Sequence, residues 1–167
     1  MTKRPVIVGV MGGGNVPPET EEIARRLGRR IAEAGWVLLN GGRNAGVMAA
    51  SARGAAEAGG LTVGVLPDDH DGAVAPDIRI PILTGIGGGR NMINILSSHA
   101  VVACRGGAGT LSEIALALKY RRPVILLNFP VADFFRPHAA EGQLREAITP
   151  EGAVAVVREV LGLEVGG

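Results

Sequence analysis

Four loops rich in glycine each follow a short apolar stretch of this chain, and this repeated order limits the folds that it can adopt. The loops occupy residues 12–14, 41–46, 85–89 and 106–109. The apolar stretches before them have the length and composition of strands buried in a parallel sheet. Helical patterns lie between the strands: Ile23, Leu27 and Ile31, for example, recur every four positions.

Strand and helix patterns alternate along the whole sequence. We predict strands at residues 6–11, 36–39, 61–66, 80–84, 101–104 and 124–127, and helices at 18–34, 47–58, from Arg90, from Thr110 and from Pro150 to about 161. This order predicts an α/β fold: a three-layer, Rossmann-like, mostly parallel sheet with helices on both faces, in one domain, 1–167. Pro81 places its strand at the edge of the sheet. Residues 67–79 should form a polar surface loop, and 129–137 an irregular packing segment.

The loop at 106–109 leads into a helix that Thr110 is expected to open. Glycines leave the N–H groups of the first helical turn uncovered. Those groups and the positive end of the helix dipole attract an anion, most often a phosphate. Because all four glycine loops follow strands, they should meet at the carboxyl edge of the sheet, where ligands bind in such folds.

Two common phosphate-binding motifs are absent. A dinucleotide site needs Gly-x-Gly-x-x-Gly after the first strand and an acidic residue after the second, but the first loop lacks this spacing and Asn40 replaces the acid. Gly41 and Gly46 have the separation of the P-loop glycines, but Val47 and Met48 replace its Lys-Ser/Thr. NAD binding and ATP hydrolysis are therefore disfavoured.

Composition narrows the class of partner. The net charge is +1 and there are three Phe, one Trp and one Tyr, so a nucleic-acid partner is disfavoured. No apolar run reaches membrane-spanning length, and Met1 to Arg4 lead into the first strand without a signal-peptide pattern, so we expect a cytoplasmic protein with no membrane partner. The polar run Asp68, Asp69, His70 and Asp71 could suggest a metal site, but a solvated loop is favoured. Cys104 is either a thiol of lowered pKa or, as we favour, a buried packing residue.

A family resemblance lies in the residues Gly106, Gly107, Ala108, Gly109, Thr110, Leu111, Ser112 and Glu113. They resemble the Gly-Gly-x-Gly-Thr-x-x-Glu signature of the LONELY GUY phosphoribohydrolases, long called lysine decarboxylases. Gly41 and Gly42, with Gly46 to Met48, resemble the second glycine loop of that family, and Arg90 lies where its helix carries an arginine. On these residues the chain is identified as a member of the LONELY GUY / lysine decarboxylase-like (SLOG) Rossmann superfamily.

The resemblance implies hydrolysis of a nucleoside 5′-monophosphate to a free base and ribose 5-phosphate, with no metal and no other cofactor. Glu113 would stabilise the oxocarbenium-like ribose and position water, and Arg90 would bind the phosphate or assist the leaving base. The other expected ligand-binding residues are Gly106, Gly107, Ala108, Gly109 and Thr110 for phosphate, and Gly41, Gly42, Arg43, Gly12, Gly13, Asn15 and Asn91.

Other interpretations of these residues remain open. Thr110 and Glu113 also have the spacing of a capping box, in which Glu113 would only bond back to the helix start. Arg90 could be an exposed residue at the start of its helix. The glycines could form turns that serve packing alone.

The sequence departs from the phosphoribohydrolases at two positions, since Arg105 stands where they have proline and Asn91 where they have lysine. Residues 84–91, with the signature, look closer to a sister branch of small proteins that includes a molybdenum cofactor carrier. The alternative function is therefore a non-catalytic carrier or sensor of a phosphorylated ligand, such as molybdenum cofactor or another pterin phosphate. A homodimer or higher homo-oligomer is expected. The small-residue helix near Val47 packs either on the sheet or on a second subunit, and the apolar helix after Arg90 is likewise either a dimer interface or part of the core of one subunit.

Overall fold

A computed structural model describes residues 4–164, so the expectation for Met1 to Lys3 lies outside the described residues. The strands are β1 (Ile7–Met11), β2 (Val37–Asn40), β3 (Thr62–Leu66), β4 (Ile80–Leu83), β5 (Ala100–Ala103), β6 (Val124–Leu127) and β7 (Leu144–Ala147). The helices are α1 (Pro18–Glu33), α2 (Gly46–Glu57), α3 (Arg90–Ser97), α4 (Ala108–Lys119), α5 (Ala132–Phe135) and α6 (Pro150–Val160). Two short 3-10 helices, η1 (Gly87–Gly89) and η2 (Arg136–His138), complete the described elements.

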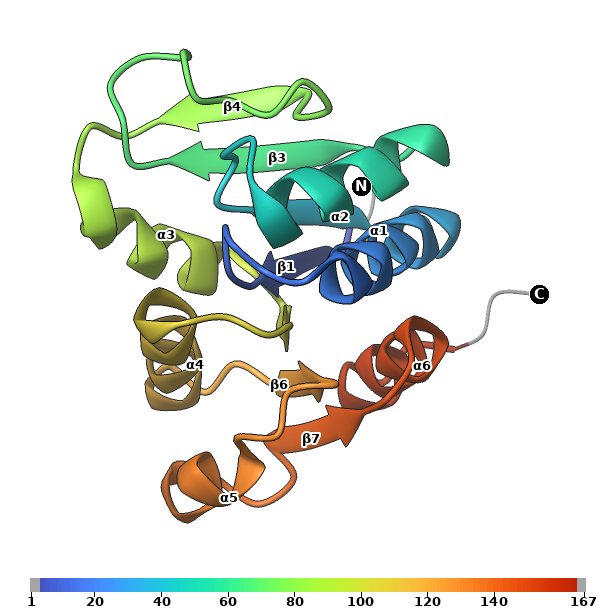
Figure 1. Ribbon diagram of the computed structural model, residues 1–167. Helices are drawn as coiled ribbons and strands as arrows, with labels where there is room; N and C mark the ends of the chain where they lie inside the picture. Colours follow the sequence, from blue (N-terminus) through green and yellow to red (C-terminus); the bar gives the residue numbers. More distant parts are fainter. Residues whose placement is uncertain (1–3, 165–167) are drawn as a thin grey trace.

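The strands form one parallel sheet in the order β4-β3-β2-β1-β5-β6-β7 (Figure 1). The chain first builds outward from β1 to β4 and then crosses back to place β5 on the other side of β1. The strand order therefore reverses between β1 and β5. In open parallel sheets the loops at the carboxyl ends diverge at such a point and leave room for a ligand.

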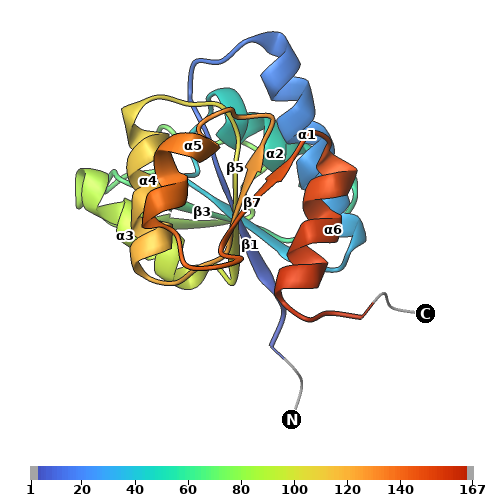
Figure 2. The same ribbon diagram turned by 90° about the horizontal axis from the view of Figure 1, so that it is seen from below.

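Helices cover both faces of the sheet, which confirms the predicted three-layer fold. Figure 2 shows α1, α2 and α6 on one side of the sheet and α3, α4 and α5 on the other. Alternate residues along each strand face the two helical layers, so that Val8 and Val102 pack in one core while Val101 and Ala103 pack in the other. Both cores consist mostly of aliphatic side chains with no exposure to solvent.

The small-residue helix α2 packs against α1 of the same chain. A Cβ atom at Gly28 of α1 would overlap the carbonyl of Ser51, and one at Gly54 of α2 would overlap the carbonyl of Arg25. The two backbones therefore touch at two places, where each glycine faces a carbonyl group of the other helix. This close packing within one chain accounts for the small residues of α2 without a second subunit.

The sequence patterns missed β7, and the segment predicted as irregular contains α5 and η2. β7 is an edge strand with only Leu144 fully buried, and its polar residues form surface ion pairs, Arg145 with Glu159 and Glu146 with Arg136. The other edge strand, β4, was predicted correctly from Pro81. No helix within residues 4–164 is both long and apolar enough to cross a membrane.

Candidate functional site

A cavity of about 230 Å³ lies at the carboxyl ends of the strands, where β1 meets its two neighbours. Three of the four glycine loops meet there, and the first residues of α3 take the place of the fourth. The cavity is lined by Val10, Met11, Gly12, Gly13, Gly14, Gly41, Met48, Arg90, Asn91, Gly107, Gly109, Thr110 and Glu113. The predicted meeting of loops at one edge of the sheet is therefore found, except that the loop at 85–89 does not line the cavity.

Backbone hydrogen bonds hold the loops together. The N–H group of Gly13 donates to the carbonyl of Arg105 at 2.9 Å, and the N–H group of Val47 donates to the carbonyl of Gly13 at 3.0 Å. The first glycine loop is thus joined both to the loop before α4 and to the start of α2. Arg105 contributes its backbone to this arrangement, while its side chain is exposed.

Asn40 shapes the second glycine loop, a role that the sequence analysis did not assign to it. Its buried amide nitrogen Nδ2 donates to the carbonyl of Met48 at 2.9 Å and to Oγ of Ser51 at 3.0 Å. Its Oδ1 accepts from the N–H group of Gly42 at 2.8 Å. The sequence signal that could have indicated this role is a polar residue at the end of a buried strand, directly before two glycines.

Helix α4 begins two residues earlier than expected. Its first residue is Ala108 and its N-cap is Gly107, so Thr110 lies inside the first turn instead of opening the helix. The capping-box interpretation requires Thr110 to be the N-cap residue, and it is therefore wrong. Glu113 lies one turn further along α4, on the face that lines the cavity.

The carboxyl group of Glu113 is almost fully enclosed, with 9% of the residue exposed. Its Oε2 accepts a hydrogen bond of 3.4 Å from Nδ2 of Asn94 on α3. Burial raises the pKa of Glu113 to about 7, against the opposing effects of the Asn94 hydrogen bond and the charge of Arg90. At neutral pH the cavity therefore holds a carboxyl group that can readily gain or lose a proton.

Arg90 is half-buried and turned inward, so its interpretation as an exposed helix-start residue is wrong. Its Nη1 donates to the carbonyl of Val65 at 2.7 Å and also to the carbonyl of Gly41. Burial lowers the pKa of Arg90, and the nearby charge of Glu113 opposes this shift. The guanidinium thus ties α3 to the loop after β2 and places its charge beside the cavity.

The glycines of the signature differ in what they do. A Cβ atom at Gly106 would overlap Oγ1 of Thr110 and lie 2.8 Å from the backbone nitrogen of Gly13, so packing alone requires glycine there. A Cβ atom at Gly107 or Gly109 would meet no atom within 4 Å, and neither residue has a positive φ angle. At these two positions, neither packing nor backbone conformation within the described chain calls for glycine.

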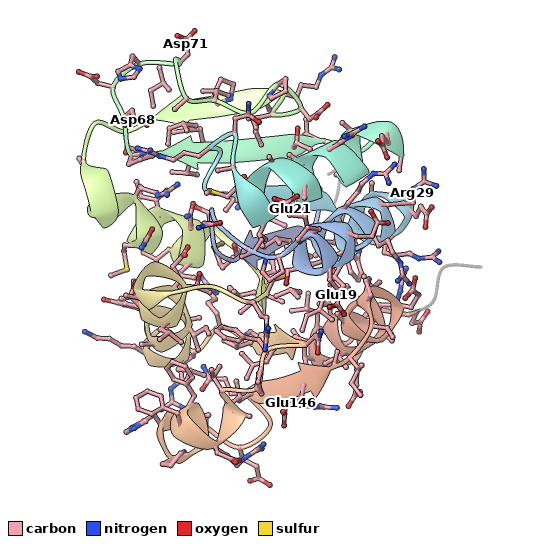
Figure 3. The ribbon with its side chains drawn as sticks, viewed as in Figure 1. Glu19, Glu21, Arg29, Asp68, Asp71 and Glu146 are labelled. Carbon is pink, nitrogen blue, oxygen red and sulfur yellow. The ribbon has the colours of Figure 1, made fainter. Side chains whose placement is uncertain are left out.

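Five of the predicted ligand-binding residues do not line the cavity: Gly106, Ala108, Gly42, Arg43 and Asn15. Arg43 instead pairs with Asp68 through two hydrogen bonds of 3.0 and 3.1 Å to its carboxylate. Asp68 and Asp71 lie on the loop between β3 and β4 (Figure 3). The lining residues that the sequence analysis missed are Val10, Met11, Gly14 and Met48, which nothing in a pattern of apolar and glycine residues distinguishes from core or turn positions.

Two further groups can be placed. Cys104 has no exposure to solvent, and burial raises the pKa of its thiol to about 12, so a reactive thiolate is excluded and the packing interpretation is confirmed. Within residues 4–164 there is no group of three or more His, Cys, Asp or Glu side chains arranged to hold a metal ion.

Comparison with known proteins gives matches over nearly the whole chain. The molybdenum cofactor binding protein of Rippkaea orientalis is similar with a TM-score of 0.90 and 43% identity, covering 96% of this chain and 99% of that one. The molybdenum cofactor carrier protein of Chlamydomonas reinhardtii is similar with a TM-score of 0.88 and 43% identity, covering 95% and 99%.

Similarity to named enzymes is lower in sequence identity. A cytokinin riboside 5′-monophosphate phosphoribohydrolase of Rhodococcoides fascians is 27% identical over 161 residues, which are 82% of this chain and 80% of that protein. A cytokinin riboside 5′-monophosphate phosphoribohydrolase of Mycobacterium tuberculosis is 36% identical over 104 residues, which are 58% of this chain and 52% of that protein. The match thus spans about half the length of the enzyme. The model of the SLOG cluster4 family matches residues 5–158. The chain therefore belongs to the SLOG cluster4 family, which agrees with the SLOG superfamily expected from its glycine loops, Arg90 and Glu113.

Proposed function

We propose that this protein binds a small phosphorylated molecule in the glycine-loop cavity, with the phosphate at the start of α4. The observation that carries the proposal is the pair Gly107 and Gly109, which line the cavity where a Cβ atom would meet only open space. Space reserved beside the first turn of a helix suits a ligand that accepts hydrogen bonds from backbone N–H groups.

The charge of the cavity supports an anionic ligand. The first N–H groups of α4 have no acceptor within the helix, and the helix dipole adds positive potential at this end. Arg90 supplies the only formal positive charge among the lining residues. Glu113 can become neutral at small cost because its pKa is about 7, so that it need not repel a phosphate.

The ligand class that we propose first is a phosphorylated pterin, such as molybdenum cofactor, held without turnover. The support is the similarity to a binding protein and a carrier protein of this cofactor over nearly the full length of both chains. The geometry of Arg90 agrees with this role, since its Nη1 is engaged by two backbone carbonyls and serves to hold the loops.

A second candidate function is hydrolysis of a nucleoside 5′-monophosphate, and the position of Glu113 favours it. Its carboxyl group faces the cavity, where a helix-capping glutamate would not. In this reaction water adds to C1′ of the ribose, the bond from C1′ to the base nitrogen breaks, and the base leaves with a proton. The ionised form of Glu113 would stabilise the positive charge that develops on the sugar.

One experiment separates binding from turnover. The purified protein is incubated with AMP and, separately, with a pterin phosphate; thermal unfolding reports binding, and chromatography reports free base. We expect stabilisation by a phosphorylated ligand, and a loss of affinity of tenfold or more in Gly109→Ala, because the methyl group enters the cavity. The variant should fold at least as well as the wild type, since Ala is favoured over Gly inside a helix by about 1 kcal/mol.

The matched control is Gly88→Ala, because Gly88 also has open space around its Cβ position but does not line the cavity. Equal binding by wild type and Gly109→Ala would overturn the proposed site. Base release by the wild type that disappears in Glu113→Gln would establish the hydrolase instead of the carrier.

A further inference from the structure

Asn94 lies beside the site without lining the cavity, and it has no exposure to solvent. It is four residues after Arg90 on α3, so both side chains project from the same face of that helix. Through Nδ2 it donates to Oε2 of Glu113 at 3.4 Å. It is the one side chain in the described part of the molecule for which a hydrogen bond to Glu113 is found.

The amide oxygen of Asn94 has no hydrogen-bond partner among the described residues. Leaving a buried acceptor unpaired is costly, and most buried polar atoms in proteins are paired. The nearby hydroxyl of Ser98 does not fill this role, because it donates to the backbone carbonyl of Asn94 at 2.7 Å. An unused acceptor therefore lies on the same amide group that contacts the carboxyl of Glu113.

The two protonation states of Glu113 need different partners. The carboxylate only accepts hydrogen bonds, whereas the carboxylic acid also has an O–H group to donate. An asparagine side chain carries donors and an acceptor on one planar group, and a half-turn about its terminal bond exchanges them. Asn94 can thus satisfy Glu113 in either state, while an apolar residue or a lysine could not.

We propose that Asn94 is the positioning residue of Glu113, and that the side-chain amide of Asn94 rotates by half a turn when the carboxyl group of Glu113 gains a proton. Nδ2 donates to the carboxylate, and Oδ1 accepts from the carboxylic acid. This role rests on the ligand site proposed above. A phosphate that enters the cavity favours the neutral form of Glu113, and Asn94 then holds the neutral carboxyl group in place by accepting its hydrogen bond.

The charged groups near Glu113 influence its carboxyl group through their charge and do not position it by hydrogen bonds. From α3, Arg90 faces the carboxyl group and favours its ionised form. The charge of Arg43 lowers the pKa of Arg90 and the charge of Asp68 raises it, and these two residues form an ion pair with each other. None of these groups is a hydrogen-bond partner of Glu113 in the described chain.

The test follows Glu113 and Asn94 directly by NMR in the protein without ligand. With glutamate labelled at the δ carbon, the Glu113 carboxyl should titrate in the wild type near neutral pH. Asn94→Leu should raise its midpoint by about one pH unit, because the variant loses the hydrogen bonds to both protonation states and the bond to the charged carboxylate is the stronger of the two. The matched control is Gln143→Leu, which removes a buried amide that donates to the carbonyl of Leu118 at the other end of α4.

A second measurement uses the wild type alone, so it does not depend on the folding of a variant. The side-chain NH₂ signals of Asn94 should shift with pH at the Glu113 midpoint, and they should stay constant in Glu113→Gln. Signals of Asn94 that do not follow Glu113, or an unchanged midpoint in Asn94→Leu, would overturn the proposal. Because no ligand is present, this result is independent of whether the proposed ligand binds.

Discussion

Thr110 lies in the first turn of α4, three residues after the N-cap Gly107, and Glu113 lies one turn further along the helix. This offset removes Glu113 from the helix terminus and places its carboxyl group among Arg90, Asn94 and the glycine loops. The local spacing of threonine and glutamate was compatible with both a cap and a site. The start of the helix decides between them, because a capping box needs the threonine at the N-cap and the glutamate three residues later, and the N-cap of α4 is Gly107.

The raised pKa of Glu113 predicts how stability depends on pH. The folded protein holds a proton on Glu113 up to about pH 7, whereas an unfolded glutamate releases it near pH 4.5. Folding therefore binds a proton between these values, and the stability from this group falls as pH rises from about 4.5 to about 7, by about 3 kcal/mol in total.

Glu113→Gln should remove this dependence, because glutamine is neutral throughout. In denaturant unfolding at a series of pH values, the free energy of unfolding of Glu113→Gln should increase relative to that of the wild type between pH 4.5 and 7. Above pH 7 the difference between the two should be constant. Glu21→Gln, a change at an exposed carboxyl of α1, should show no such gain. A difference between Glu113→Gln and wild type that does not vary with pH would contradict a buried, titrating carboxyl.

At the scale of elements, the glycines of α1 and α2 control how closely these helices approach. Gly28 and Gly54 each face a backbone carbonyl of the other helix, without space for a methyl group. The sequence showed a helix of small residues but left its neighbour open, either the sheet or a second subunit. Only the tertiary structure identifies α1 as the element that requires these glycines.

Gly54→Ala should lower the free energy of unfolding by about 2 kcal/mol or more, because α1 must move away from α2. This loss exceeds the gain of about 1 kcal/mol expected from replacing glycine inside a helix. The measurement is urea unfolding, with Ala56→Ser on the exposed side of α2 as control. If Gly54→Ala were as stable as the control, the close contact between the two helices would be absent.

At the scale of the whole molecule, the segment from β4 to α3 carries several exposed apolar side chains. Ile80, Ile82, Leu83, Ile86 and Leu96 are between 42% and 55% exposed. Arg90 is the only charged residue of the segment 80–98, and its guanidinium points inward to backbone carbonyls. Exposed apolar side chains of this kind suit burial against a second copy of the chain, which is the contact that the predicted homo-oligomer requires.

Light scattering coupled to size-exclusion chromatography tests this expectation. The wild type should elute as a dimer or larger oligomer, and Leu96→Asp should shift it toward the monomer because the charge would be buried in the contact. Ile148→Asp is the control, since Ile148 is an apolar residue with 82% exposure that follows β7 and lies outside the segment from β4 to α3. A monomeric wild type would contradict the prediction.

The sequence by itself determined the fold class, the order of most elements and the meeting of three of the four glycine loops. These follow from local causes: apolar runs form strands, helical spacing forms amphipathic helices, and parallel strands bring their carboxyl ends to one edge. It also indicated Glu113 and Arg90. It missed β7, because an edge strand with exposed polar residues carries little hydrophobic pattern.

Only the tertiary structure decided what the site residues do. It separated Gly106, which packing requires, from Gly107 and Gly109, which border open space. In the folded chain Arg43 pairs with Asp68, Arg90 points inward beside the cavity, and Asn94 donates a hydrogen bond to Glu113. Contacts between side chains far apart in the chain depend on the packing of α3 against α4 and on the positions of whole loops, and no local pattern encodes them.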